Sequence, residues 1–281
     1  MRNKLISSLT GAVFSFAASG LAFAADIAVK APLPPPAPVC IWCGFYVGLS
    51  AGYGWSRDNV EPVGTVTGAP TGFDAILAAT QVAAIPSTLS TNANGFIGGG
   101  QIGWNWQWYQ FAVLGVEADF SGLAGKGSNS FTTVLPVDGS GDKLASTTSV
   151  DRRLEFLGTV RGRLGFALDR LLIFGTGGYA YGHAQSSTTI TQTCIGLCVP
   201  ISGPPLLGSE NLGGWAAGGG MEYSFGFWSV KAEYLHYDLG HMQYAPTTLT
   251  SAFTTINVAS TANFKGDLVR VGLNYQFHYG P

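Results

Sequence analysis

Charged residues recur at alternate positions in several otherwise apolar stretches of this sequence. One residue separates Glu117 from Asp119, and one separates Arg161 from Arg163. Alternate residues of a β-strand lie on the same face, so each pair directs its charges to one side. A buried charge is costly unless it is paired. The spacing therefore predicts strands whose polar faces meet in an enclosed, ion-paired interior.

The same alternation, followed through every strand-like stretch, places five acidic and five basic residues on polar faces. These residues are Glu117, Asp119, Glu155, Glu222, Glu233, Arg153, Arg161, Arg163, Lys231 and Arg270. We expect Arg161 and Arg163 to pair with Glu117 and Asp119, because the stretches that carry them are adjacent. The equal numbers favour a sealed lumen, and a narrow or gated pore through the same charges is the alternative.

Histidine and serine could supply a second kind of chemistry. His183, His236 and His241 fall near one end of the expected strands, where a base beside Ser186 or Ser187 would suit a lipid-modifying hydrolase. The sequence contains no nucleophile-elbow or zinc-type motif. We therefore expect no catalytic site, metal or cofactor, and we keep the enzyme as the least favoured alternative.

The four cysteines form two closely spaced pairs, Cys40 with Cys43 and Cys194 with Cys198. In an exported chain such pairs predict local disulfides. A zinc site would need both pairs together, but the expected topology puts them at opposite ends of the fold. A redox role for the first pair is the alternative, although no thioredoxin-like βαβ pattern surrounds it.

The stretch 264–277 shows most clearly the kind of strand that positions these charges. Val269 and Leu273 lie on an apolar side, whereas Arg270 and Asn274 lie on the opposite side. One face requires lipid and the other requires water or polar partners. In a membrane, a strand of this kind is stable only in a closed barrel, where no backbone group at an edge is unpaired.

Seven further stretches alternate in the same way, which gives eight strands. Their ranges are 44–55, 94–107, 110–122, 151–168, 171–183, 213–224, 227–238 and 264–277. Three of the connections are very short. We therefore predict an all-β fold, an eight-stranded antiparallel up-and-down transmembrane β-barrel with four long extracellular loops and three short periplasmic turns.

Aromatic residues and long polar segments complete the expected barrel. The long segments, expected as loops, are 56–93, 123–150, 184–212 and 239–263. A short helix at 74–85, ended by a proline, is expected in the first. Aromatic residues gather near both strand ends, as in the girdles of membrane barrels, and Trp42 is expected in the periplasmic girdle.

Composition and targeting agree with this fold. Only 11% of the 281 residues are charged, against about 25% in soluble proteins. Residues 1–24 are expected to be a signal peptide, 25–43 a proline-rich periplasmic tether and 44–281 an outer-membrane β-barrel. No long apolar run follows the signal, and the net charge of −2 gives no reason to expect nucleic-acid binding.

The strand sequences also resemble a known family. The stretches GFYVGLSAGYGW (44–55), LGTVRGRLGFALDRLLIFGTGGYAYG (157–182) and LVRVGLNYQF (268–277) are similar to small outer-membrane β-barrel surface antigens. These are porin-like proteins of rhizobial and related Gram-negative bacteria with an OmpA-like barrel. The resemblance implies a structural surface protein of the cell outer membrane that contributes to envelope integrity and surface interactions, with no catalytic residue set.

The resemblance also implies partners. The barrel would contact outer-membrane lipid and lipopolysaccharide, and Tyr275 and Phe277 would belong to the signal that the barrel-assembly machinery reads. The sequence departs from the family pattern after Phe277, because residues 278–281 extend past the usual terminal aromatic.

Overall fold

The computed structural model describes residues 40–68, 70–137, 139, 141–196 and 198–277. The chain divides into two units, Met1–Ala37 and Pro38–Pro281, and all of the described residues lie in the second. The predicted signal peptide at 1–24 and residues 25–39 of the predicted tether therefore lie outside the described residues.

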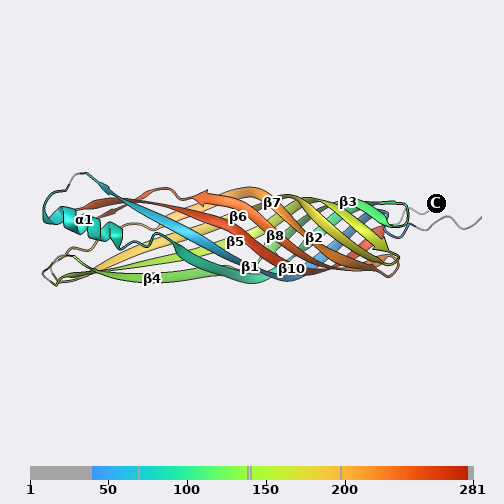
Figure 1. Cartoon of the computed structure of the whole chain (residues 1–281), viewed down its shortest axis with the longest axis horizontal. Coiled ribbons are helices and arrows are strands. Elements are labelled where there is room, and N and C mark those ends of the chain that lie inside the picture. Colours follow the sequence, from blue (N-terminus) through green and yellow to red (C-terminus); the bar gives the residue numbers. More distant parts are fainter. Residues whose placement is uncertain (1–39, 69, 138, 140, 197, 278–281) are drawn as a thin grey trace, which may run out of the picture. The chain divides into compact units, whose positions relative to one another are not determined.

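Within the described residues, antiparallel strands wind round one axis and close into a barrel (Figure 1). The elements are β1 (Gly44–Thr67), α1 (Phe73–Ala83), β2 (Leu89–Trp108), β3 (Ala112–Leu123), β4 (Lys126–Pro136), β5 (Lys143–Leu168), β6 (Leu171–Ile195), β7 (Leu206–Ser224), β8 (Trp228–Gln243), β9 (Thr247–Thr250) and β10 (Thr255–Phe277).

The ten strands form eight positions round the barrel. β4 follows β3 along the same side of β5, and β9 follows β8 along the same side of β10. The remaining strands each occupy one position, and pairing of β1 with both β2 and β10 closes the ring. The predicted eight-stranded antiparallel barrel is confirmed.

Three of the four segments expected as loops are mostly strand, and the first, 56–93, holds two strand ends and α1, so that part of the prediction was wrong. β1 continues to Thr67, and β6 continues to Ile195. Most of segment 123–150 lies in the hairpin that β4 forms with the first part of β5. These segments are rich in threonine, whose branched side chain favours extended backbone. The barrel wall therefore continues well beyond the eight predicted strands, and we call this part the outer half. The helix α1 lies in it, close to the predicted 74–85.

The three short connections lie at the opposite end, as predicted. They consist of residues 109–111, 169–170 and 225–227. Asp169 has a φ of 55°, and Gly226 a φ of 90°. Tight hairpin turns require such left-handed backbone, because it follows the right-handed twist of the strands.

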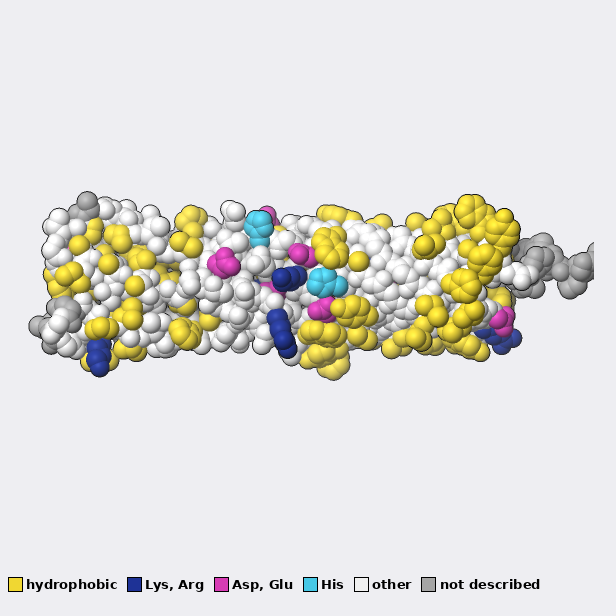
Figure 2. Space-filling model, in the orientation of Figure 1, with side chains coloured by type: hydrophobic (Ala, Val, Ile, Leu, Met, Phe, Trp, Pro, Cys, Tyr) yellow, Lys and Arg dark blue, Asp and Glu magenta, His cyan; other side chains and the backbone are white. Residues whose placement is uncertain are grey.

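We call the rest of the barrel, from the short turns to about Trp55 of β1, the inner half. On the face drawn in Figure 2 its hydrophobic side chains form two bands, a first at the short turns and a second near the middle of the barrel, and no charged side chain lies between them; we call this zone the apolar belt. From Phe45 to Trp55, β1 rises roughly 26 Å along the axis at a typical tilt of about 40°. This height matches the band of about 25 Å that a membrane barrel presents to lipid. Exposed aromatics of the second band are Tyr53, Trp55, Phe96, Phe120, Tyr181, Trp215 and Tyr234.

Charged residues and histidines lie within and directly beyond this second band in Figure 2 and mark the level where the belt ends. No helix in the described part of the chain is long and apolar enough to cross a membrane.

The inside of the barrel changes character along its axis. At the level of the belt it holds charged residues, whereas in the outer half it holds an apolar cluster that includes Val60, Leu89, Leu206 and Ile256. On α1, Leu77 faces inward and packs in a neighbouring cluster with Leu144 and Val137. The charged interior therefore lies between the short turns and an apolar core.

Candidate functional site

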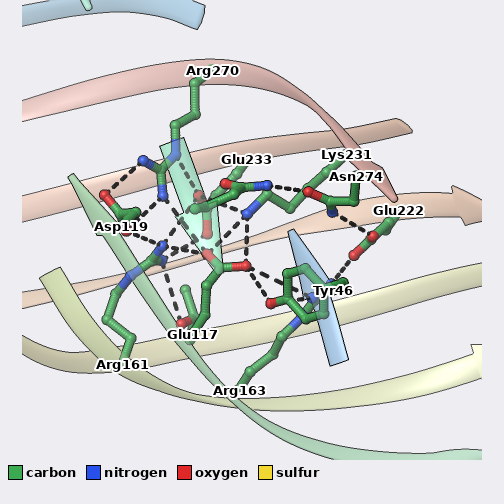
Figure 3. A network of polar contacts seen from close by, with 12 residues as sticks. Tyr46, Glu117, Asp119, Arg161, Arg163, Glu222, Lys231, Glu233, Arg270 and Asn274 are labelled. Carbon is green, nitrogen blue, oxygen red and sulfur yellow. Dashed lines mark hydrogen bonds and ion pairs between the residues drawn. The ribbon is translucent and has the colours of Figure 1, made fainter. Parts of the chain in front are cut away.

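Glu117 is at the centre of the interior charges (Figure 3). The hydroxyl of Tyr46 donates to its Oε2 over 2.6 Å, and Lys231 Nζ donates to both carboxylate oxygens over 2.9 Å. Arg161 Nη2 donates to Oε1 over 2.7 Å. These donors come from β1, β8 and β5, while Glu117 lies on β3. One carboxylate therefore links four strands across the interior.

A second group of ion pairs lies beside Glu117 (Figure 3). Arg270 donates from Nη1 and Nη2 to the two oxygens of Asp119, over 2.9 and 3.1 Å, and from Nε to Glu233 Oε2 over 2.7 Å. Arg161 also contacts both carboxylates, at 2.9 Å from Asp119 and 2.7 Å from Glu233. Two guanidinium groups and two carboxylates thus form a closed ring of charge-assisted hydrogen bonds.

Arg163 and Glu222 form the third group, nearer the short turns. Arg163 pairs with Glu222 through Nη2, and its guanidinium carbon lies 3.9 Å from the centre of the Phe174 ring. Asn274 Nδ2 and Ser229 Oγ donate to Glu222 Oε1 over 2.7 and 2.5 Å. Stacking and hydrogen bonds together replace much of the water that these two charges lose on burial, although Arg163 Nε has no hydrogen-bond partner among the described residues.

Glycines on the inner faces of the strands make room for these large side chains. A Cβ atom at Gly103 would lie 2.3 Å from the Tyr46 ring, and one at Gly52 would lie 2.1 Å from the Val269 carbonyl oxygen and 2.6 Å from Arg270 Cα. Small residues on β1 and β2 therefore let side chains from other strands fill the interior.

The interior charges balance within the network. Its ionisable members are Glu117, Asp119, Glu222, Glu233, Arg161, Arg163, Lys231 and Arg270, which are 0–6% exposed. Four carboxylates thus meet four cations, and every one of the eight makes an ion pair shorter than 3 Å. The arrangement can bind no further charge without breaking a pair.

Trp42 closes the barrel at the end of the short turns. It is 1% exposed and packs with Val113, Leu172 and Phe174. Its indole N–H donates to the carbonyl oxygen of Asp169 over 3.1 Å. The expectation of Trp42 in the lipid-facing periplasmic girdle was wrong, because the chain turns inward before β1 begins. Residues 40–43 therefore pack on the barrel instead of belonging to a tether.

The structure places eight of the ten predicted interior charges inside the barrel and two outside. Arg153 and Glu155 pair with each other on the exterior. The cause is a β-bulge, since the register of β5 against β6 shifts between Leu154 and Phe156. One extra residue reverses which alternate positions face inward. The prediction of Arg153 and Glu155 in the interior was therefore wrong.

The expected pairing of Arg161 and Arg163 holds only in part. Arg161 contacts Glu117 and Asp119, but Arg163 makes its short contact with Glu222 and lies 3.9 Å from Glu117. Sequence reasoning also missed Tyr46 as a donor to Glu117. The sequence does contain a feature that could have identified Tyr46, because it is the one large side chain on the inner face of the 44–55 stretch, where the other residues are small.

A separate buried ion pair, absent from the predictions, lies where the outer half begins. Arg152 Nη1 is 3.2 Å from Asp58 Oδ2, and its guanidinium carbon stacks 4.2 Å from the centre of the Phe264 ring. Burial raises the pKa of the Asp58 carboxyl above its usual range, although the Arg152 charge partly opposes this shift. Burial likewise raises the pKa of the neighbouring Tyr237.

The histidines make contacts other than the expected ones with serine. His183 Nδ1 lies 2.9 Å from Asn211 Oδ1, and its Nε2 lies 3.2 Å from Ser209 Oγ. His236 Nδ1 lies 2.8 Å from Asp267 Oδ1 on the exterior. Ser186 faces the interior and donates to the carbonyl oxygen of Asp151. The structure thus brings neither His183 nor His236 together with Ser186.

The cysteines pair locally, Cys40 with Cys43 and Cys194 with Cys198, as the spacing predicted. Among the described residues no group of histidine, cysteine, aspartate and glutamate could hold a metal ion. At the end of β10, Tyr275 and Phe277 face outward with ring centres 5.0 Å apart, and Phe277 lies 5.7 Å from Phe45 of β1. Their role as an assembly signal stays a prediction, and residues 278–281 lie outside the described residues.

Comparison with known proteins gives the family. Residues 41–277 match the outer membrane protein beta-barrel domain. The 31 kDa outer-membrane immunogenic protein of Brucella melitensis biotype 1 is 33% identical, over 99% of this chain and 100% of that protein. The 25 kDa outer-membrane immunogenic protein of Brucella abortus biovar 1 is 25% identical, over 98% of each chain.

A solved structure similar to this chain is the outer membrane protein OprG of Pseudomonas aeruginosa, with 9% identity, a TM-score of 0.35 and coverage of 84% of this chain and 97% of that chain. The domain match over nearly the whole barrel and the first Brucella relative together settle the classification. The chain is an outer-membrane protein and belongs to the outer membrane protein beta-barrel family.

Proposed function

We propose that this protein is a structural surface protein of the outer membrane whose barrel does not conduct. The observation that carries the proposal is the interior network around Glu117, in which four carboxylates and four cations fill the barrel at the level of the apolar belt. An eight-stranded barrel is just wide enough for its side chains to fill. Ions would have to break several buried pairs to pass.

On this proposal the protein contributes to envelope integrity and carries its long outer half beyond the membrane. Outer-membrane lipid and lipopolysaccharide surround the belt, and the barrel-assembly machinery reads the strand end that contains Tyr275 and Phe277. The proposal assigns no catalytic role. Two observations support this: His183 contacts Asn211 and Ser209, and the relatives are named for immunogenicity.

Single-channel recording in planar bilayers tests the proposal. We expect the refolded protein to give no conductance steps. The Glu117→Ala, Arg161→Ala double variant removes two facing interior side chains and leaves Trp42 and the apolar core of the outer half in place, so steps from it would place the seal in the network around Glu117 alone. A porin of known conductance in the same bilayers shows that the assay detects an open lumen. The Arg153→Ala, Glu155→Ala double variant removes the exterior pair and should remain silent. Regular, ion-selective steps from the unaltered protein would instead favour a narrow porin.

A further inference from the structure

One strand of the outer half pairs on one side only. β4 pairs with β5 from Lys126 to Pro136. On its other side it pairs with β2 only at Lys126, opposite Asn94. Farther along, the side chain of Asn129 donates from Nδ2 to the carbonyl oxygen of Ser90 over 2.5 Å. In the described part of the chain, no second strand pairs with Ser130–Pro136. We call these seven residues the free edge of β4.

Exposure confirms that the free edge is uncovered. Phe131 on the inner face of β4 is 51% exposed, whereas Leu144 and Val150 on the inner face of the adjacent β5 are 0% and 1% exposed. The contrast is sharp for Phe131, because it lies opposite Thr148, which is fully buried. On this inner face, burial is therefore complete on β5 and much reduced on β4 at Phe131, whereas Leu135 is partly buried against the cluster of Leu77 and Leu144.

The edge lacks the usual protection against strand addition. Natural edge strands are commonly blunted by charges, bulges or covering segments. The sequence from Gly127 to Val137 contains no charged residue, and Ser130–Val134 reads SFTTV. Pro136, which cannot donate a hydrogen bond, lies only at the end of the strand. Roughly 24 Å of strand edge, at about 3.4 Å per residue, is thus available for pairing.

We propose that the free edge of β4 binds an extended, uncharged segment of another polypeptide, which adds to the sheet as a further antiparallel strand. Main-chain hydrogen bonds would supply affinity, and an apolar side chain beside Phe131 would supply selectivity. The site lies in the outer half, on the far side of the apolar belt from the short turns, so the partner is a protein outside the cell.

A second copy in the same membrane does not fit this edge. Copies that share a membrane are related by rotation about its normal, so both β4 strands run in the same sense along that direction. Antiparallel pairing needs opposite senses. The tilt of barrel strands, about 40°, would moreover make the two edges cross. The geometry therefore favours a flexible segment over a neighbouring barrel.

Binding of a strand peptide tests the proposal. The probe is a fluorescent, end-blocked peptide with the sequence of residues 144–150, LASTTSV, because this uncharged segment forms a strand in β5 and can therefore adopt the extended backbone that strand addition requires. We expect saturable binding to the refolded full chain in micelles, measured by fluorescence anisotropy. Hydrogen exchange should slow in Ser130–Pro136 when the peptide is present. A peptide with proline in place of Thr147 should not bind.

Two matched variants locate the binding. Thr132 on β4 and Thr191 on β6 both lie opposite Thr147 of β5, and both are exposed. Thr132→Lys places a charge on the free edge and should weaken binding by about tenfold or more, since lysine blunts strand edges. Thr191→Lys places the same charge on a strand without this edge and should change binding by less than about twofold, as isolated surface substitutions usually do.

Three results would overturn the proposal. They are the absence of saturable binding, equal loss of binding in both variants, and slowed exchange in a segment other than the free edge. Concentration-dependent self-association that Thr132→Lys abolishes, without peptide binding, would assign the edge to a second copy instead. The hydrogen-exchange measurement needs no variant, so the test does not depend on how a substituted chain folds.

Discussion

Replacement of Glu117 by glutamine removes one buried charge and leaves the size of the side chain unchanged. Lys231 would then keep only Glu233, at 3.8 Å, whereas Arg161 would keep Asp119 at 2.9 Å and Glu233 at 2.7 Å. Lys231 is 0% exposed. The variant therefore leaves a buried ammonium group almost without a counter-charge.

The expected loss of stability follows from this geometry. Breaking a buried ion pair on one side typically costs about 3–5 kcal/mol, whereas breaking an exposed pair costs about 0–1 kcal/mol. Because Arg161 retains two partners, we expect about 3 kcal/mol, near the lower end of the buried range. Adding Lys231→Met should recover most of this loss, since the interior is then balanced again.

Urea unfolding in phospholipid vesicles, followed by tryptophan fluorescence, measures these differences. Glu155→Gln is the matched control, because it makes the same substitution in the exterior pair with Arg153, and it should cost less than about 1 kcal/mol. A near-zero change for Glu117→Gln, together with a shift in ion selectivity, would refute a dry interior. Charges that line a watered channel set selectivity without holding the fold together.

Three further outcomes are expected. Trp42→Ala should lower the unfolding free energy by about 3–5 kcal/mol in the same assay and yet give no conductance, because the network around Glu117 still fills the barrel; conductance would show that Trp42 alone seals it. Between the usual and the raised pKa of Asp58, the folded state holds more protons than the unfolded chain, so the unfolding free energy should fall as pH rises through that window. Asp58→Asn should lack this slope, and a slope of opposite sign would contradict the raised pKa. Epitope tags at Thr71 or Gly139 should be reachable on intact cells, and labelling only after permeabilisation would reverse the orientation.

Alternation was enough to predict the inner half of the barrel. In that half one face meets lipid and the other meets charges, so positions such as Arg270 and Val271 differ sharply in polarity. The same pattern also predicted the three short turns, because only a few residues separate the alternating stretches that they join. The location of Glu117 and Asp119 on an inner face required no information beyond the period of a strand.

The outer half could not be predicted in the same way, because its two faces differ less in polarity. In 145–150 the residues are Ala, Ser, Thr, Thr, Ser and Val, and small hydroxyl side chains occur on both faces. The usable signal was composition, since runs of threonine favour extended backbone. β4 and β5 form a hairpin of consecutive strands, but neither strand alternates sharply enough there for the pattern to mark it.

The β5 bulge shows why a strand can be predicted correctly while its inward-facing residues are predicted wrongly. Counted back from Arg161 and Arg163, alternation directs Arg153 inward and Arg152 outward, and the structure reverses both. Counted forward from Leu144, which is buried, the same rule places Arg152 inside, where it meets Asp58. The two counts disagree by one residue somewhere in the strand, and sequence pattern alone does not say where. Only an independent requirement resolves it: a buried arginine needs a carboxylate, and Asp58 becomes available to Arg152 once β1 is extended past Trp55 into the outer half. How far the strands extend therefore also decides which charged residues face inward. A prediction that extended β1 past Trp55 would have placed Arg152, and not Arg153, inside the barrel.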